Sequence, residues 1–514
     1  MLTYPFITRI TSAIAVAAIA CAVQEPSPSP AAPGAAPGAK GPLIIPQPKS
    51  LRMGSGVCRV QPDSRWVLRA AARDEGLWQA AQSALGGKRG TFEKVAQPWV
   101  TLAVGSGSAA NFPTGPNQPR WASDPEGYRL TVETNGFVIL AATAQGAFYG
   151  LQTLEQLWEE SAEGRLCPVV DIEDWPVMRF RGAHWFPSAS GVPMHQKLIR
   201  NVFGAFKLNR SVIQCEAAQW DKHPEITAPN AVSKADLRRL VATGRGCFLE
   251  PIPLVNVPGH AEWIFRNGSN LDFAEDPQTP YAYCVNHPKS FAFIQDVLNE
   301  CLPVFESKYC HIGHDEVTMR GRFPSPECPR CKGATTTELV VKHANRLNEW
   351  LNERGVESMV WGDMLLGPGE AKDATHAKTL ADARARREAI SRKVIIVDWH
   401  YAASADASSL ELLRKEGFRV VAASWYTPAN IHHLAQAALA TGAEGLLQTT
   451  WMGYFPDEQA MKTQLQQFTA FVLAAEYAWS GRKEHPAQLG YDAKEVFLKA
   501  YNRPRSIGAP GAGG

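Results

Sequence analysis

The chain has 514 residues, of which 45% are hydrophobic and 20% are charged, so it is long enough to bury sizeable cores in two to four domains. Its 52 Lys and Arg residues nearly balance its 50 Asp and Glu residues, and no long basic run occurs. This balance argues against a nucleic-acid-binding protein. The apolar stretch at residues 10–23 is too short for a convincing membrane span, which needs about 20 apolar residues.

The N-terminus has the features of an export signal. Residues 1–21 contain a single Arg and no acid, and the Arg is followed by a run of small apolar residues. The run ends in Ala18-Ile19-Ala20-Cys21, which resembles a bacterial lipobox; ordinary signal cleavage beside it is the alternative. Residues 22–42 are rich in Pro, Ala and Gly and predict a linker without a core. We therefore expect an exported protein, either anchored to a membrane by a lipid on Cys21 or free in the periplasm or outside the cell.

Residues 43–171 predict a small α+β domain. Strand-like runs occur at 99–104, 127–132 and 137–142, and Asn135-Gly136 between the last two is a strong hairpin signal. Apolar residues at helical spacing follow at 143–158. Strands followed by a helix are typical of a compact α+β domain, which we expect mainly to pack against the next domain.

Residues 172–485 predict a (β/α)8 TIM barrel, an α/β fold, and residues 486–514 a C-terminal tail. Eight short apolar runs alternate with helical stretches, as parallel strands buried on both faces do. The runs are 179–184, 211–216, 251–257, 308–313, 358–361, 394–399, 419–425 and 445–451. The helical stretches include 194–207, 234–243, 287–305, 336–354 and 409–416. A doubly wound open sheet is the alternative, but it would usually place a Gly-rich phosphate turn where this chain has Arg181-Gly182-Ala183-His184.

Acidic and aromatic side chains recur where these predicted strands end. Active sites of TIM barrels lie at the carboxyl ends of the strands. A ring of Trp around paired carboxylates suits a pyranose, which offers apolar faces for stacking and a bond for acids to break. The residues at these ends are His184, Trp185, Glu216, Asn256, His260, His314, Asp315, Glu316, Trp361, Asp363, Trp399, His400, Tyr401, Trp425, Tyr426, Trp451 and Tyr454.

One segment resembles a known family. His311-Ile312-Gly313-His314-Asp315-Glu316 is similar to the His-x-Gly-x-Asp-Glu signature of family 20 glycoside hydrolases, the β-N-acetylhexosaminidases. Asp174-Trp175-Pro176 and Pro258-Gly259-His260 also resemble motifs of that family, and the similarity extends over roughly residues 43–480. Within the family the chain looks closer to the hexosaminidase D-like branch. The segments that fit this branch are 207–209, 214–216, 251–255, 259–262 and the Cys-Pro-Arg-Cys at 328–331. The chain departs from the best-known members at Trp185-Phe186-Pro187 and after Trp451, where those members carry acids that contact sugar hydroxyls.

The resemblance implies an exo-acting glycoside hydrolase that removes terminal β-linked N-acetylhexosamine from glycans. Two adjacent residues leaving one strand point in different directions, so Asp315 and Glu316 are poorly placed to flank one bond as an ordinary acid and nucleophile. Substrate-assisted retaining catalysis, in which the 2-acetamido oxygen attacks, removes this difficulty. Glu316 would then be the general acid/base with a raised pKa, while Asp315 stays ionised and orients the acetamido N–H.

The remaining expected site residues bind substrate. We expect Arg181 to bind sugar hydroxyls, with a buried ion pair as the alternative, and His260 to pair with Glu316 or to be a satisfied polar residue. One of two tyrosines should hold the acetamido oxygen, and the sequence leaves that choice open. The complete set of expected substrate-binding residues is Arg181, Glu216, His260, Trp361, Trp399, Tyr401, Trp425, Tyr426 and Trp451.

No cofactor and no metal site are predicted. Cys328-Pro329-Arg330-Cys331 is a lone CxxC, whereas a zinc site normally needs four ligands, so a local disulfide or two free thiols is the simpler interpretation. A metal site to which His311, His314 or Cys310 adds ligands is the alternative. Two other functions are compatible with the barrel. One is a non-catalytic glycan-binding surface lipoprotein; the other is a metal-dependent hydrolase, although no His-x-His follows the first predicted barrel strand.

Overall fold

The computed structural model describes residues 41–61, 64–85, 89–105, 112–161, 164–320, 322–453 and 456–504. The predicted export signal, all but the end of the predicted linker, and Tyr454 therefore lie outside the described residues. From Pro42 onward the chain forms one compact unit. Among the helices described, none has the length and apolar character needed to cross a bilayer.

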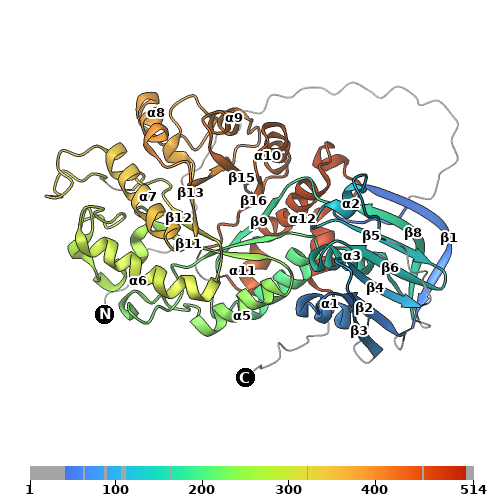
Figure 1. The fold of residues 1–514 in the computed structure, drawn as a ribbon. Helices are drawn as coiled ribbons and strands as arrows, with labels where there is room; N and C mark the ends of the chain where they lie inside the picture. The colour runs from blue at the N-terminus through green and yellow to red at the C-terminus, as the bar shows by residue number, and fades with distance from the viewer. Residues whose placement is uncertain are drawn as a thin grey trace. The chain divides into compact units, whose positions relative to one another are not determined.

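The N-terminal part is a mostly antiparallel sheet (Figure 1). Its strand order is β1(Ser50–Val60), β8(Gly164–Asp174), β5(Tyr128–Glu133), β6(Gly136–Ala141), β4(Val100–Gly105), β2(Trp66–Ala70) and β3(Gly90–Lys94), with the short β7(Glu159–Ser161) beside β8. The helices of this part are α1(Glu75–Leu85), α2(Arg120–Ser123) and α3(Ala144–Leu157). The predicted α+β class and the hairpin are confirmed, since β5 pairs with β6 through Glu133 and Gly136. The last strand reaches Asp174, three residues beyond the predicted boundary.

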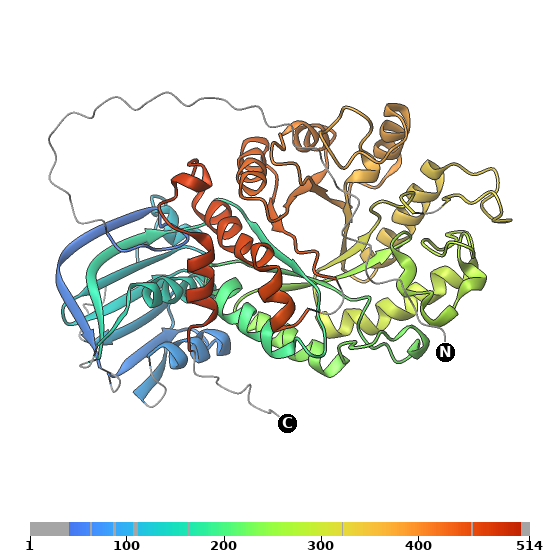
Figure 2. The same ribbon diagram turned by 180° about the vertical axis from the view of Figure 1, so that it is seen from behind.

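The second part is a closed barrel of eight parallel strands, as the sequence predicts (Figure 2). The strands are β9(Phe180–Trp185), β10(Arg210–Gln214), β11(Glu250–Val257), β12(Tyr309–Gly313), β13(Glu357–Trp361), β14(Ile395–Trp399), β15(Arg419–Ser424) and β16(Gly445–Gln448), and β16 pairs with β9. Each predicted run overlaps one strand. The open-sheet alternative is therefore wrong.

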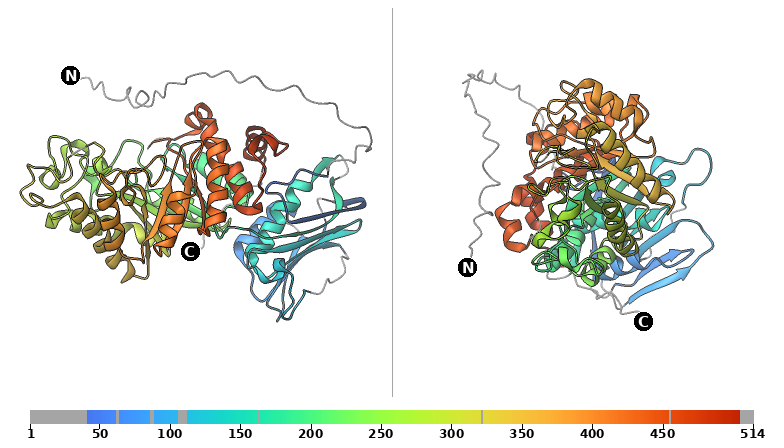
Figure 3. Two further views of the ribbon diagram at one scale, coloured as in Figure 1. Left: turned by 90° about the horizontal axis from the view of Figure 1, so that it is seen from above. Right: turned by 90° about the vertical axis from the view of Figure 1, so that its left-hand side faces the viewer.

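Helices surround this barrel (Figure 3). They are α4(Val192–Leu198) with the π-helical turn Ile199–Gly204, α5(Lys234–Arg245), α6(Pro288–Phe305), α7(Thr336–Asn352), α8(Leu380–Ala389), α9(Ser408–Lys415), α10(Pro428–Thr441), α11(Glu458–Thr463), α12(Leu465–Ser480) and α13(Ala493–Tyr501). Short 3₁₀ turns occupy Pro224–Ile226, Ala261–Trp263, Arg266–Gly268, Leu271–Phe273, Asp363–Leu365 and Pro486–Gln488. Within the predicted C-terminal tail, α13 buries Phe497 and Tyr501 in the core.

The barrel interior is a packed apolar core and not a channel. Side chains from most of its strands meet there, including Phe180, Val212, Met359 and Val421, and Trp361 is among the buried members. Because these side chains fill the interior, polar chemistry is confined to the strand ends and the loops that follow them.

Candidate active site

The predicted acidic pair leaves β12 through a run of unusual backbone. Gly313, His314 and Glu316 have φ values of 66°, 75° and 47°, which place them in the left-handed region. A Cβ on Gly313 would lie 2.6 Å from Asn256 Oδ1, so only glycine fits there. Non-glycine residues in this region cost on the order of 1 kcal/mol or more each and cluster at functional sites. The turn therefore aims two consecutive carboxylates at the barrel mouth.

The two carboxylates differ in their surroundings. Asp315 is 8% exposed, and its Oδ1 has no hydrogen-bond partner among the described residues. Glu316 is half-buried; its backbone N–H donates to Asp363 Oδ2 (2.8 Å), and its carbonyl accepts from the Tyr281 hydroxyl (3.0 Å). The backbone of Glu316 is thus fixed from both sides, whereas an oxygen of Asp315 is left for a donor from outside the protein.

His260 joins the pair. Its Nε2 lies 3.2 Å from Glu316 Oε2 and 3.5 Å from Asp315 Oδ2. Burial lowers the pKa of His260, but Asp315 and Glu316 outweigh burial and raise it to about 9. The predicted pairing of His260 with Glu316 is therefore present. At neutral pH an imidazolium bridges the two acids.

Asp315 holds a proton more readily than an ordinary aspartate does. Burial is the largest of several effects that together raise its pKa to about 7; Asp363 and Glu316 also raise it, and His260 lowers it. A carboxylate with an unsatisfied buried oxygen is costly to charge. An N–H donor from a ligand would supply the missing hydrogen bond and favour the ionised form.

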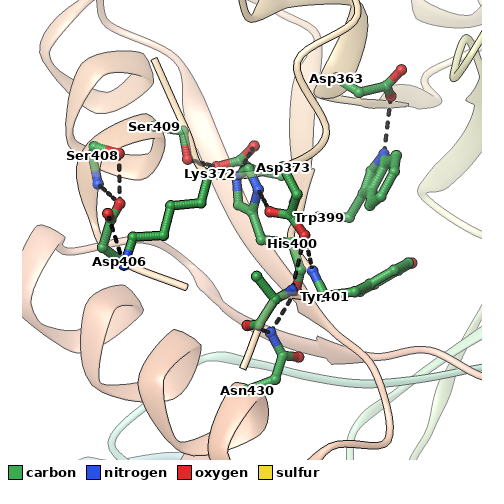
Figure 4. Close-up of polar contacts among 12 residues, drawn as sticks. Asp363, Lys372, Asp373, Trp399, His400, Tyr401, Asp406, Ser408, Ser409 and Asn430 are labelled. Carbon is green, nitrogen blue, oxygen red and sulfur yellow. Dashed lines mark hydrogen bonds and ion pairs between the residues drawn. The ribbon is translucent and has the colours of Figure 1, made fainter. Parts of the chain in front are cut away.

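Asp363 contacts several residues of the candidate site. The sequence analysis located it at a strand end but did not include it among the expected site residues. Its Oδ1 accepts the indole N–H of Trp399 (3.0 Å), as Figure 4 shows, and its Oδ2 accepts from His376 Nδ1 (2.8 Å) as well as from the Glu316 backbone. Asp363 therefore links the end of β12 to the end of β14. The acid after predicted strand five was the available signal; nothing local in the sequence marked His376.

Aromatic rings from the last strands form one wall of the site. Tyr401 lies 4.8 Å from Trp399 and 5.3 Å from Trp425, measured between ring centroids. The indole N–H of Trp451 donates to the Tyr401 hydroxyl (2.8 Å), and Trp451 lies 5.9 Å from Trp361. Four predicted Trp residues and Tyr401 thus come together. Tyr426 lies at the edge, where its ring meets Trp425 edge-on at 4.5 Å.

Asp373, on the segment between β13 and α8, holds Tyr401 in place. The Asp373 carboxylate accepts the backbone N–H groups of Tyr401 (2.7 Å) and Ala402 (2.9 Å) and faces His400 Nδ1 (2.8 Å). His400 Nε2 lies 2.8 Å from Ser409 Oγ (Figure 4). His400 therefore stabilises the segment that carries Tyr401. Of the residues at the end of β14, Tyr401 is the one whose side chain packs with the aromatic wall.

Arg181 is a correction. It is fully buried near the start of β9, and its guanidinium donates to both carboxylate oxygens of Glu126 (2.9 and 2.8 Å) in the N-terminal part. Its other donors reach the carbonyls of Lys207 and Met178. Sugar binding by Arg181 is therefore wrong, because the active sites of such barrels lie at the opposite ends of the strands. The buried ion pair that was the alternative is what the structure contains.

Glu216 ends β10 as predicted, but its carboxylate is already engaged. It accepts the Asn256 backbone N–H (2.8 Å), and the Gln214 amide, with its nitrogen turned toward it, donates to both oxygens (2.8 and 2.9 Å). Burial raises the pKa of Glu216 to about 7. We assign Glu216 to holding the end of β11 and not to touching substrate.

Two other features lie outside the barrel mouth. A cavity of about 680 Å³ lies beside α3 and α13, and its lining includes Gln152, Asn201 and Arg503 but none of the predicted site residues. A second group of side chains with metal-ligand chemistry lies on the loops after β11 and β12, and its members are Glu275, Cys284, Cys328 and Cys331.

Comparisons with known proteins agree with this architecture. The family model described as "Glycosyl hydrolase family 20, domain 2" matches residues 41–175, and the model described as "Glycosyl hydrolase family 20, catalytic domain" matches residues 209–482. Solved structures with the same fold include the β-N-acetylhexosaminidases of Bacteroides fragilis (17% identity, TM-score 0.65, 89% of this chain and 98% of the other) and Streptomyces coelicolor (18%, 0.64, 89% and 96%).

Curated relatives match over shorter lengths. A β-hexosaminidase of Porphyromonas gingivalis is 28% identical over 49% of this chain and 37% of its own length. A lacto-N-biosidase of Bifidobacterium bifidum is 21% identical over 46% of this chain and 22% of its own length. The chain thus spans less than half the length of these two relatives. The catalytic-domain match alone covers more than half of the chain, and on that ground the protein belongs to glycosyl hydrolase family 20.

Proposed function

We propose that this protein is an exo-acting β-N-acetylhexosaminidase that removes terminal β-linked N-acetylglucosamine or N-acetylgalactosamine from glycans with retention of configuration. The observation that carries the proposal is the unpartnered Oδ1 of the buried Asp315, next to Glu316 and His260. An acetamido N–H is a donor that would complete this arrangement. The Vibrio harveyi structural neighbour, an exo β-N-acetylglucosaminidase, was solved with N-acetylglucosamine.

The first step would break the bond between C1 and the glycosidic oxygen. Glu316 donates its proton to that oxygen while the acetamido carbonyl oxygen forms a bond to C1, which gives an oxazolinium ion. Asp315, ionised by its new hydrogen bond, orients the N–H and faces the developing positive charge. In the second step the Glu316 carboxylate takes a proton from water as the water oxygen bonds to C1, and the oxazolinium ring opens.

His260 assists this exchange. As an imidazolium 3.2 Å from Glu316 and 3.5 Å from Asp315, it limits the repulsion between two carboxylates in a half-buried site. Its positive charge also lowers the pKa of Asp315.

Tyr401 is our choice for the group that holds the acetamido oxygen. Its ring lies 4.8 Å from that of Trp399, whose indole N–H donates to Asp363, the carboxylate that also accepts the Glu316 backbone N–H. The N–H of Trp451 already donates to this hydroxyl, which leaves the Tyr401 proton free to be donated onward to a ligand. The ring of Tyr426 contacts Trp425 edge-on, and Tyr426 has no ring contact with Trp399 or Trp451 among the described residues.

A matched pair of variants tests this assignment. Tyr401→Phe should lower kcat/KM for a chromogenic N-acetylglucosaminide by about 10²-fold, the order found when one donor to a developing oxyanion is removed. Tyr426→Phe should retain nearly full activity. Equal losses in both variants, or a loss only in Tyr426→Phe, would overturn the choice of Tyr401.

The alternative of a non-catalytic glycan-binding protein is not favoured, because the acid pair, His260 and the aromatic wall are all present. Hydrolysis of the chromogenic glycoside by the wild-type protein separates the two. Binding of N-acetylglucosamine without turnover would support the binding protein.

We further propose that the protein is exported and carries a lipid on Cys21, and that it belongs to the hexosaminidase D-like branch. The lipobox-like segment and the Pro/Ala/Gly linker support the anchor. Two or more acyl chains are needed for stable membrane attachment, as in a lipidated N-terminal cysteine. The wild-type protein should partition into detergent, and Cys21→Ser should not. Unchanged partitioning of Cys21→Ser would leave simple secretion.

A further inference from the structure

We propose that Glu275, Cys284, Cys328 and Cys331 bind one structural zinc ion. This site is separate from the acid pair and goes beyond the proposed hydrolase function. The four ligand atoms all lie within 4.8 Å of one another, and the four residues are between 0 and 6% exposed. Only the Cys328–Cys331 pair was visible in the sequence; the fold brings the other two residues to it.

The sulfur geometry fits a tetrahedral metal. Cys284 Sγ lies 3.5 Å from both Cys331 Sγ and Cys328 Sγ. Zinc–sulfur bonds of about 2.3 Å at tetrahedral angles place two sulfurs about 3.8 Å apart, close to these separations. A disulfide needs about 2.05 Å, and all three cysteines are free.

Glu275 supplies the fourth ligand. Its Oε1 accepts the backbone N–H of Ser325 (2.8 Å), which fixes the carboxylate, while its buried Oε2 has no hydrogen-bond partner among the described residues. A buried carboxylate oxygen without a partner is costly, so a cation beside it resolves an otherwise unfavourable arrangement. Four protein ligands leave no open position, which is typical of structural zinc and not of catalytic zinc.

The surroundings of the cluster resemble the outer shell of a metal site. The Asn286 amide donates to Cys331 Sγ at 3.5 Å and to the Arg330 carbonyl at 3.1 Å. Such donors stabilise thiolates, the form that binds zinc, and three thiol protons would leave as the ion binds.

The ion would join the two loops that build the acid site. Glu275 and Cys284 lie on the loop between β11 and α6, which carries His260, and they are brought together by the antiparallel bridge between Ala274 and Tyr283. Cys328 and Cys331 lie on the loop between β12 and α7, which begins at His314.

The same two loops also meet directly through protein contacts. The Tyr281 hydroxyl donates to the Glu316 carbonyl, and Asp276 pairs with Arg322 (3.1 Å). Zinc would reinforce these contacts and keep the histidine and the acids in register.

Metal analysis of untagged full-length protein, produced with zinc in the medium, tests the proposal. We expect about one zinc per chain in the wild type and in Cys247→Ser, and at least about tenfold less in Cys328→Ser. Cys247 is a matched control because, like Cys328, it is 6% exposed and forms no disulfide. A zinc-free wild type, or equal zinc in both variants, would overturn the site.

X-ray absorption at the zinc edge of the wild-type protein keeps the test valid if Cys328→Ser fails to fold. We expect three sulfurs at about 2.3 Å and one oxygen at about 2.0 Å. Iron or copper in place of zinc, a nitrogen- and oxygen-only shell, or a Cys328–Cys331 disulfide found by mass spectrometry would contradict the proposal.

Discussion

His260 Nε2 lies 3.2 Å from Glu316 Oε2, and this hydrogen bond connects the loop after β11 to the loop after β12. The imidazolium form is favoured because the neighbouring carboxylates overcome burial and hold the pKa of His260 at about 9. The positive ring of His260 in turn lowers the pKa of Asp315, whereas burial raises it. The protonation of the site therefore depends on His260.

Replacing His260 should move the acid limb of the pH–rate profile. His260→Gln removes the cation that lowers the pKa of Asp315, so that pKa rises and kcat/KM begins to fall at a higher pH as the pH is lowered. We expect a shift of about one pH unit, the lower end of the effect of a close opposite charge. Profiles of kcat/KM measured from pH 4 to pH 9 check this. His223→Gln is the control, because His223 faces Glu225 and Asp296 outside the site; an unmoved limb in His260→Gln would contradict the coupling.

Glu316→Gln should separate substrates by their leaving groups. A glycoside with a very good leaving group needs no proton, so its cleavage step should lose little, whereas natural glycosides should lose about 10²–10⁴-fold, the usual contribution of general acid catalysis. Steady-state rates on an aryl glycoside and on a chitobiose-type disaccharide test this. Equal losses on both would show that Glu316 does not act as the acid.

Glu216 should make stability depend on pH. Its pKa of about 7 in the folded protein lies above the ordinary value of 4.5, so the folded state holds the proton more tightly. Between these two values the folded state binds more protons than the unfolded state, and stability falls as the pH rises, by at most about 3 kcal/mol, and then levels off above pH 7. Glu216→Gln should flatten this part of the curve in denaturant titrations at pH 5 and pH 8. An unchanged pH dependence would show that Glu216 is ionised throughout.

Arg181→Met should damage stability and not substrate binding. It leaves Glu126 as a buried acid without its partner, and breaking a buried pair from one side costs about 3–5 kcal/mol. We expect a lower midpoint of urea unfolding with an unchanged KM for the protein that remains folded. The double variant Arg181→Met with Glu126→Gln should recover part of the loss. A raised KM at unchanged stability would restore the discarded sugar-binding role.

The barrel could be predicted because its strands are buried on both faces and read as continuous apolar runs. Helix α8 was not predicted, since Leu380–Ala389 alternates Ala with charged residues. Its Arg386 and Arg387 are buried by donating to the carbonyls of Met364 and Leu365, a contact that no local pattern encodes.

The location of candidate site residues was predictable where it depends on position along a strand, as for Asp315, Glu316 and Trp399. It was not predictable where function depends on partners far away in sequence. Arg181 is engaged by Glu126 from the other part of the chain, and Cys328 meets Cys284 only after two loops have folded. A strand-end position says that a side chain is near the mouth; it does not say whether its polar atoms are already satisfied, as those of Glu216 are.

The central claim is that the substrate's own acetamido group is the nucleophile and that Asp315 orients it. The most direct measurement compares kcat/KM for 4-nitrophenyl N-acetyl-β-glucosaminide and 4-nitrophenyl β-glucoside, with wild type and Asp315→Asn side by side. We expect the wild type to cleave only the N-acetylated substrate at an appreciable rate, and Asp315→Asn to lose about 10²-fold or more on it, because ring closure precedes every later step. Equal wild-type activity on both glycosides, or near-normal turnover by Asp315→Asn, would contradict the mechanism.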